Sequence, residues 1–207
     1  MRVDVDPEAV GRREFYALLN SVVVPRPIAW VSSLSADGVL NLAPHSFFTV
    51  SCVQPPMVQF TSVGRKDSLN NVEATREFVV NFAAEPLYEQ VNASGTNFPP
   101  EISEFEAIGV TTEPSATVAV PRVAESPVAI ECTLHATIGL GDCTVVIGHV
   151  RHLAIDAAVM DGDHPDIHRL RPLARLGKDE WTTLGEVREI PRIRYSQWPG
   201  HFTPPGS

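Results

Sequence analysis

Apolar and polar residues alternate along several short stretches of the chain, which predicts an antiparallel sheet rather than a helical fold. Residues 28–34 and 39–43 alternate on either side of the Asp37–Gly38 step, whose residue types allow the left-handed backbone of a tight reversal. Pro44 is expected to bend the chain at the end of the second strand. Further strands are predicted where aromatic and β-branched residues concentrate, at residues 46–53, 57–61 and 77–82.

A second, longer hairpin is predicted nearer the C-terminus. Residues 130–138 alternate strictly, so we expect one face, from Ile130 to Ile138, to be buried and the other, which carries Glu131, to face solvent. The sequence Gly-Leu-Gly-Asp at residues 139–142 then reverses the chain into a strand over residues 143–155. Several short strands close together favour an antiparallel barrel over a parallel sheet.

Helical spacing predicts three flanking helices. The first contains Phe15, Leu18, Leu19 and Val22; the second begins at Ser68, with Asp67 or Ser68 as its cap; the third begins near Pro86 and runs to residue 93. Residues 95–126 carry only a weak local pattern and are expected to form a long excursion. The predicted fold class is therefore mainly β with flanking helices.

Length and charge narrow the classes of function. The 207 residues with 43% hydrophobic content suffice for one domain, residues 1–207, with a core at about 20–155, a C-terminal tail at about 170–207 and a frayed end at 203–207. The formal charge of −9 disfavours nucleic acid and anionic membranes as partners. Because the sequence contains neither a long apolar span nor a signal peptide, we expect a cytoplasmic protein.

Cysteine and histidine spacing does not indicate a metal site. Cys52, Cys132 and Cys143 lie far apart without a CxxC pair, and are interpreted as buried reduced thiols. His164 and His168 are four residues apart, but Pro165 lies between them, which favours a polar loop over a pair of metal ligands. Dinucleotide-fold, P-loop and nucleophile-elbow motifs are also absent from the sequence.

The sequence of residues 64–68 predicts an anion-binding corner at the turn that leads into the second helix. Arg65 offers a planar fork of donors, Lys66 a point charge and Gly64 backbone freedom, and the first N–H groups of the following helix add to them. This combination suits a phosphate monoester. The alternative is that the two basic residues are solvated surface charges before an ordinary helix start.

Residues 41–48 combine small residues, a rigid proline, a hydroxyl, an imidazole and two aromatic rings. Such a lining suits a planar, partly polar ring, with apolar walls for its faces and polar groups for its rim. The alternative is a strand in which Phe47 or Phe48 belongs to the core and His45 is merely exposed.

These residues resemble a known family. The sequence PRPIAWVSSLSADGVLNLAPHSFF, followed by QPPMVQFTS, GRKDS and EFVVNF, is similar to the flavin reductase-like family of FMN-binding split-barrel proteins, of the flavoredoxin and NADH:FMN oxidoreductase type. The likeness covers about residues 20–155. Residues 175–177 and 184–186 resemble the C-terminal tail of the family, although Lys178 replaces a usual small residue and Trp181 a usual tyrosine.

The resemblance implies an antiparallel split β-barrel and a homodimer that binds FMN between its subunits, with FAD as the less favoured flavin. The corner of residues 65–68 would lie at the FMN phosphate, together with Ser32 or Ser33, and Ser62 would lie between phosphate and ring. The isoalloxazine would be bordered by residues of the kinked strand. The complete implied set is Ser32, Ser33, Ala43, His45, Ser46, Phe47, Ser62, Arg65, Lys66, Asp67 and Ser68.

Three functions follow from the resemblance. The first is an NAD(P)H-dependent flavin reductase that uses NADH or NADPH and supplies reduced flavin or electrons, for instance to a flavin-dependent monooxygenase. The second is a flavoredoxin-like electron carrier with tightly bound FMN, and the third is a flavin-binding module without turnover. The flavin carries the redox chemistry in each case, so His45 is the sole side chain considered for catalysis, and no metal is expected.

Overall fold

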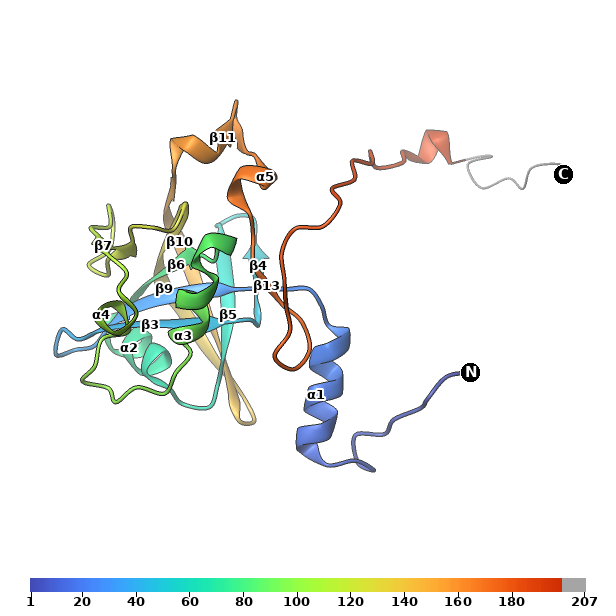
Figure 1. Cartoon of the computed structure of the whole chain (residues 1–207), viewed down its shortest axis with the longest axis horizontal. Helices are drawn as coiled ribbons and strands as arrows, with labels where there is room; N and C mark the ends of the chain where they lie inside the picture. Colours follow the sequence, from blue (N-terminus) through green and yellow to red (C-terminus); the bar gives the residue numbers. More distant parts are fainter. Residues whose placement is uncertain (199–207) are drawn as a thin grey trace, which may run out of the picture.

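A seven-stranded antiparallel sheet forms the body of the protein (Figure 1). The structure is a computed structural model that describes residues 1–198. The strand order is β3-β2-β6-β9-β10-β5-β4. The strands are β2 (Ala29–Leu34), β3 (Leu40–His45), β4 (Phe48–Cys52), β5 (Met57–Val63), β6 (Glu77–Phe82), β9 (Val128–Leu140) and β10 (Cys143–Ile155). The predicted strands and both hairpins are confirmed.

The sheet is curled because its two edge strands are consecutive in sequence. Strands β3 and β4 lie at opposite ends of the sheet, yet only Ser46 and Phe47 separate them. Six strand spacings of about 4.8 Å would place the ends of a flat sheet about 29 Å apart, far beyond the reach of two residues. The sheet must therefore bend round until β3 lies beside the β4–β5 pair, and the 2.9 Å bond from Thr61 N–H to the Phe47 carbonyl secures this junction.

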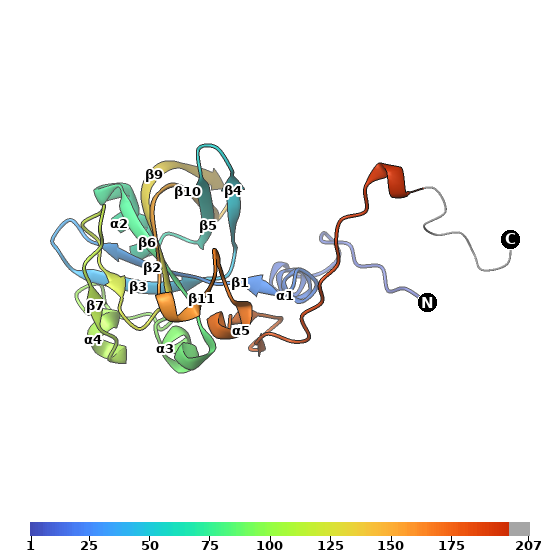
Figure 2. The same cartoon turned by 90° about the horizontal axis from the view of Figure 1, so that it is seen from above.

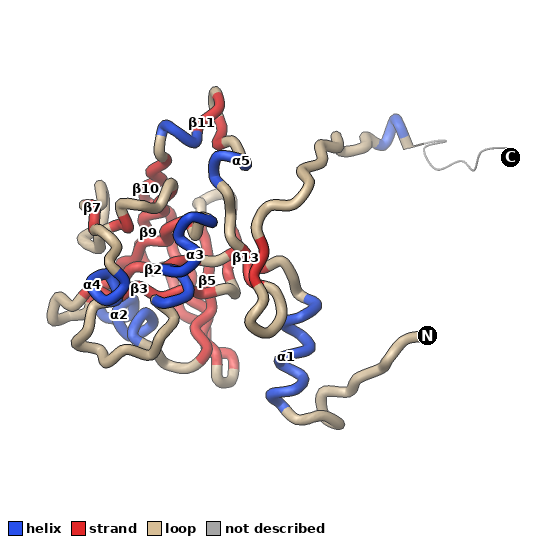
Figure 3. Tube along the Cα trace, viewed as in Figure 1, coloured by secondary structure: helices blue, strands red, loops and turns tan. Residues whose placement is uncertain are grey.

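Other helices and short strands lie around the curled sheet, whereas α1 and the described residues that follow β14 extend away from it on one side (Figures 2 and 3). The helical elements are α1 (Arg12–Val22), α2 (Asp67–Thr75), η1 (Glu85–Leu87), α3 (Tyr88–Ala93), α4 (Glu104–Ile108), η2 (Ala157–Val159), α5 (Ile167–Leu170) and η3 (Tyr195–Gln197). The short strands are β1 (Arg26–Pro27), β7 (Thr112–Glu113), β8 (Arg122–Val123), β11 (Met160–Asp161), β12 (His164–Pro165), β13 (Ala174–Arg175) and β14 (Trp181–Thr182). None of the helices within residues 1–198 has the length and apolar character needed to span a membrane.

Strand β2 separates two hydrophobic cores. Ala29 and Val31 face the inside of the curled sheet with Phe60 and Phe78, whereas Trp30 faces a second core beneath α3 and α4. Because both faces of β2 are covered, the strand is buried almost along its whole length. The first core is Ala29, Val31, Val58, Phe60, Leu69, Val72, Phe78, Val80, Cys132, Leu134 and Val146, and the second is Ile28, Trp30, Leu42, Ala83, Leu87, Val91, Phe105, Val123 and Leu173.

Two local predictions about the chain were wrong. The second strand was expected to end at Ala43, but β3 continues to His45 with Pro44 opposite Trp30, which an edge strand allows. Helix α2 begins at Asp67 with Lys66 as its N-cap residue, and no side chain accepts a capping hydrogen bond there. The N-terminal helix and the helix that follows Pro86 are confirmed.

The cysteine and histidine interpretations have mixed outcomes. All three cysteines are free thiols, but Cys132 alone among them is buried, and its burial raises the pKa of the thiol to about 12. His164 and His168 were expected in a polar loop, but they lie on β12 and α5. Residues 1–198 contain no cluster of three or more metal-ligating side chains. The expected frayed end at residues 203–207 lies outside the described residues.

The expectation of a solvent-facing side for β9 was wrong at Glu131, which is fully buried. The excursion over residues 95–126 folds across it, so that the carboxylate accepts bonds from Thr117 N (2.7 Å), Thr117 Oγ1 (2.6 Å), Ala116 N (2.9 Å) and Arg122 Nε (3.0 Å). Burial alone raises the pKa of Glu131, but these hydrogen bonds and the charge of Arg122 outweigh it and hold the pKa below its ordinary value. At the other end of the strand, Ile138 is 48% exposed although it was expected to be buried.

Replacing Glu131 by glutamine should destabilise the fold, because the amide cannot accept all four bonds and leaves Arg122 without its buried partner. We expect the free energy of unfolding to fall by about 2–4 kcal/mol in urea titrations at neutral pH. Since the pKa of Glu131 is lowered on folding, the difference in free energy of unfolding between wild type and Glu131→Gln should disappear as the pH falls through the pKa of the folded protein. Glu125→Gln is the control, because Glu125 accepts from Thr111 N at an exposed position and should contribute less than about 1 kcal/mol. Equal losses in the two variants would contradict this role for Glu131.

Candidate functional site

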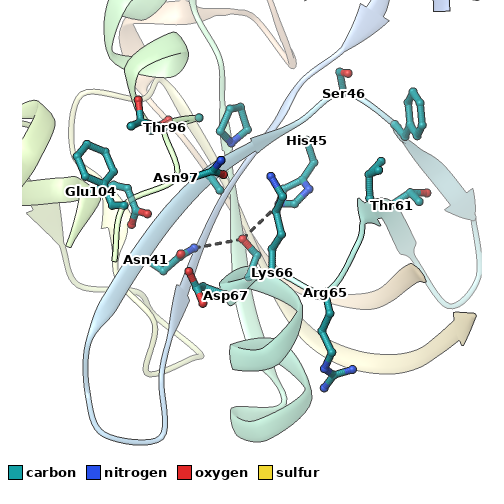
Figure 4. Close-up of a pocket in the computed structure, with 18 of the residues that line it drawn as sticks. Asn41, His45, Ser46, Thr61, Arg65, Lys66, Asp67, Thr96, Asn97 and Glu104 are labelled. Carbon is teal, nitrogen blue, oxygen red and sulfur yellow. Dashed lines mark hydrogen bonds between the residues drawn. The ribbon is translucent and has the colours of Figure 1, made fainter. Parts of the chain in front are cut away.

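A pocket of about 370 Å³ opens where β3 approaches β5, at the junction that closes the curled sheet (Figure 4). Its walls come from α1, from β3 and the Ser46–Phe47 link, from β5, from the start of α2, and from the loop between α3 and α4. The lining residues are Tyr16, Asn41, Ala43, Pro44, His45, Ser46, Phe47, Thr61, Val63, Arg65, Lys66, Asp67, Ser68, Ser94, Gly95, Thr96, Asn97, Phe98 and Glu104.

Most residues of the predicted flavin site are brought together in this pocket. Ala43, His45, Ser46, Phe47, Arg65, Lys66, Asp67 and Ser68 all line it, although the two groups are separated by some twenty residues of sequence. The alternative interpretation placed Phe47 or Phe48 in the core and His45 at the surface. Phe48 does pack against the first core, but His45 is buried rather than exposed.

Ser32, Ser33 and Ser62 do not line the pocket, and each is fully buried. The Ser32 hydroxyl donates to the Pro121 carbonyl at 2.8 Å, and the Ser62 hydroxyl donates to the Gly64 carbonyl at 2.9 Å. Ser33 Oγ accepts from Asn71 Nδ2 at 3.1 Å. All three hydroxyls therefore hold protein segments together.

The basic end of the pocket lies at the start of α2. Lys66 lies beside His45, whereas Arg65 points away from both and pairs with Glu73, 2.5 Å between Nη2 and Oε2 (Figure 4). The Arg65 side chain is 64% exposed, so this ion pair is screened by solvent and can be exchanged. Because α2 lacks a side-chain cap, the N–H groups of its first turn remain available to an anion.

His45 is a buried and neutral imidazole at the pocket wall. Its side chain contacts the Phe60 ring at a centroid distance of 4.6 Å, and Nε2 lies 3.3 Å from Ser68 Oγ. Burial, aided by the charge of Lys66 and opposed by a backbone hydrogen bond with Thr61, lowers the pKa of His45 to about 4. At neutral pH, His45 therefore offers a hydrogen-bonding group without charge.

A buried hydrogen-bond network fixes the pocket wall to the sheet. Asn41 Nδ2 donates to Ser68 Oγ at 3.1 Å and reaches Ser33 Oγ at 3.4 Å, while Asn71 approaches the same Ser33 hydroxyl from α2. The network joins β2, β3 and α2, so it sets the position of the basic corner relative to the strand that carries His45.

Several lining residues were not predicted from the sequence. Residues 94–98 lie at the start of the excursion, which carried only a weak local pattern, and they are fixed in place partly by the 2.8 Å bond from Trp30 Nε1 to Ser94 Oγ. Tyr16 comes from α1 and lies edge-on to Phe47 at a centroid distance of 6.5 Å. A local pattern could not reveal either group, because long-range packing brings them to the pocket.

Glu104 is the other unpredicted residue of the pocket, and its side chain is only 6% exposed. Its Oε2 accepts a 2.9 Å bond from Leu42 N. Burial raises the pKa of Glu104, the bond from Leu42 opposes that shift, and the nearby Asp67 adds to it. The pocket thus has an acidic region, formed by Glu104 and Asp67, as well as its basic end.

Comparison with known proteins identifies the family. The model of the flavin reductase like domain matches residues 21–169. An uncharacterized protein from Aquifex aeolicus is 39% identical over 168 residues, covering 78% of this chain and 86% of the relative.

Two solved structures share the fold over nearly their full lengths. Nitrilotriacetate monooxygenase component B from Bacillus cereus superposes with a TM-score of 0.87 and 30% identity, covering 92% of this chain and 99% of that one. The 2-nitrobenzoate 2-nitroreductase NbaA of Pseudomonas fluorescens superposes with a TM-score of 0.87 and 28% identity, covering 93% and 98%. The chain is thus a split-barrel protein and belongs to the flavin reductase-like family.

Proposed function

We propose that the protein is an FMN-dependent NAD(P)H:flavin oxidoreductase that binds FMN in the pocket between β3 and β5. The observation that carries this proposal is the pocket itself, because one opening combines a basic helix start with an aromatic and proline-lined strand edge. Membership of the flavin reductase-like family supports a flavin as the cofactor. FMN is favoured over FAD because a terminal phosphate suits the compact corner at Lys66 and the α2 N-terminus.

The residues of the pocket fit the parts of FMN. Lys66 and the uncapped first turn of α2 would hold the phosphate, with Arg65 exchanging from Glu73 to join them. Asp67 and Glu104 are acceptors that suit the ribityl hydroxyls. Ala43, Pro44 and Phe47 offer apolar contacts to the ring, while Ser46 and neutral His45 provide polar contacts.

Bound flavin would supply the two-electron chemistry, and the chain would supply binding and orientation. An uncharged imidazole at position 45 avoids placing a buried positive charge beside the ring. The similarity to nitrilotriacetate monooxygenase component B supports a role in which reduced flavin or electrons pass to a monooxygenase partner. We propose NADH or NADPH as the electron donor and the cytoplasm as the location of the protein.

The similarity to NbaA favours a second candidate, direct reduction of a nitroaromatic compound on the same flavin. The deciding experiment mixes purified protein, FMN and NADH or NADPH, and follows donor oxidation with oxygen, free flavin or a nitroaromatic compound as acceptor. Rapid turnover with oxygen or free flavin supports the first function, and turnover that depends on the nitro compound supports the second. Protein that neither shifts the FMN absorbance spectrum nor oxidises either donor would refute both.

Removing the Arg65 guanidinium should weaken FMN binding while leaving the fold intact. A charge-assisted contact to phosphate contributes about 1.5–3 kcal/mol, so Arg65→Ala should lose roughly tenfold to a hundredfold in affinity. Lys66→Ala should lose less, because lysine acts as a point charge on a flexible stem. Affinity is measured by quenching of flavin fluorescence.

Riboflavin and Glu73→Gln are the controls for this measurement. Riboflavin lacks the phosphate and should bind wild type and Arg65→Ala equally. Glu73→Gln releases Arg65 from its ion pair and should bind FMN at least as tightly as wild type. Equal loss of FMN and riboflavin affinity would instead place Arg65 at the ring or in the scaffold.

The protein should lose stability in acid because of His45. Between pH 6.5 and 4 the unfolded chain takes up a proton at this residue that the folded protein does not, so the free energy of unfolding falls as the pH falls through this window. The complete effect of the His45 pKa shift on the free energy of unfolding is on the order of 3 kcal/mol. His45→Asn preserves a hydrogen-bonding group and should remove this part of the pH dependence in urea titrations. A variant whose pH profile matches the wild type would show that other groups cause the loss.

We also propose a homodimer, because α1 exposes an apolar stripe that the single chain does not cover. Leu18, Leu19 and Val22 are 43%, 50% and 74% exposed, and Tyr16 from the same helix lines the pocket. Sedimentation equilibrium should give a dimer, and Leu19→Glu should shift it towards monomer and weaken FMN binding. A wild-type monomer with FMN bound at micromolar concentration would contradict the proposal.

A further inference from the structure

A second pocket of about 280 Å³ lies beside the first, and the two share Pro44, Ser46 and Gly95 as lining residues. Its outer wall comes from the C-terminal tail, where β13 and β14 pair and bring Arg175 opposite Trp181. Strand β13 also pairs with β1, so the main body of the protein holds this wall in place. A ligand in one pocket can therefore extend past Pro44 and Ser46 into the other.

The polar group that dominates the second pocket is the Arg175 guanidinium. Its central carbon lies 4.6 Å from the centre of the Trp181 ring, and Tyr88 packs edge-on against the same ring at a centroid distance of 5.2 Å. Nη2 donates a 2.8 Å hydrogen bond to the Lys178 carbonyl, which leaves other donors of the planar fork unused. Stacking on Trp181 thus orients the guanidinium while keeping donors available.

A second arginine reinforces the positive charge of this region. Arg26 is only 8% exposed, and it donates to backbone carbonyls, including that of Leu176 at 2.8 Å, and to Ser46 Oγ at 3.4 Å. Arg26 lies opposite Arg175 in the β1–β13 pair, and both burial and the charge of Arg175 lower the pKa of Arg26. Ser46 connects Arg26 to both pockets.

These two charges lack carboxylate partners within residues 1–198. Arg12, Arg65, Arg122, Arg171 and Arg188 pair with an aspartate or glutamate. Arg26 and Arg175 instead donate to backbone carbonyls and to Ser46. Arg175 lines the cavity and Arg26 is its cross-strand partner in the β1–β13 pair, so the local charge at this wall favours an anion.

We propose that the second pocket binds the anionic group of an aromatic second substrate, which then extends its reactive end into the flavin pocket. The inference rests on the proposed function, since it assigns the position of the molecule that exchanges electrons with the flavin. Arg175 would donate to the anion, Trp181 would contact an aromatic part, and Asn92 offers an amide at the same wall. Two sources share this chemistry: the adenosine diphosphate part of a nicotinamide donor, and an aromatic carboxylate acceptor.

The test titrates FMN-loaded protein with two probes, ADP-ribose for the donor and benzoate for the acceptor, by isothermal titration calorimetry. Arg175→Met retains an apolar side chain over Trp181 and removes the charge. At least one probe should bind wild type, and that probe should bind Arg175→Met about tenfold to a hundredfold more weakly. Arg175→Lys should recover part of the affinity. Arg188→Met is the matched control, since Arg188 is exposed and paired with Glu186, and it should bind like wild type.

A kinetic comparison separates a binding role from a structural one. If the donor is the ligand, Arg175→Met should raise KM for NADH and leave turnover of 1-benzyl-1,4-dihydronicotinamide, which lacks phosphates, unchanged. The proposal is overturned if neither probe distinguishes wild type from Arg175→Met, or if FMN affinity and melting temperature fall in parallel with probe affinity. If wild type does not bind FMN, the proposed function fails, and the same titrations on flavin-free protein still decide whether the pocket binds an anion.

Discussion

The two-residue connection between β3 and β4 is the constraint on which the rest of the architecture depends. Because Ser46 and Phe47 join strands from opposite ends of the sheet, the sheet has to curl, and its hydrophobic side becomes an enclosed core. Strands β3 and β4 are the two edges of the sheet and do not pair with each other, so the barrel remains open between them. The main pocket occupies that opening, which explains why its lining combines the end of β3, the link and the outer side of β5.

Buried polar side chains hold the excursion of residues 95–126 in a fixed position against the sheet. Asn81, which is fully buried, donates to the Trp30 carbonyl at 3.0 Å and to Ser32 Oγ at 3.1 Å, and its Oδ1 accepts from Val123 N at 2.8 Å. It thereby ties the excursion of residues 95–126 to the middle of the sheet, as Glu131 does farther along. Because each buried group is costly if it loses a partner, the excursion is held in one position, and Glu104 with it.

Much of the sheet could be predicted from the sequence, because alternation and turn residues are local signals. The two basic and aromatic segments of the pocket could also be recognised, since each is a short run with its own chemistry. The predictions that failed concern residues whose surroundings come from distant segments of the chain. Glu131 has the position of a solvent-facing residue in its own strand, but residues 116 and 117 cover it. Ser32 and Ser33 were predicted as site residues, but their hydroxyls bond within the protein. The tail wall at Arg175 was likewise hidden, because it forms only when β13 pairs with β1 and β14 and so comes to face Pro44 and Ser46.

Strand β2 is specified in an unusual way, since no face of it meets water. A half-exposed strand is kept in register by the contrast between polar and apolar sides, but here both sides are buried and that contrast is lost. Register is instead encoded by volume: Ala29 and Val31 are small enough for the inner core, and Trp30 fills the outer one and bonds to Ser94. A slip of one residue would force an indole into the space of a methyl group and leave a void on the opposite side. Packing in the two cores therefore fixes the register of the strand that runs between them.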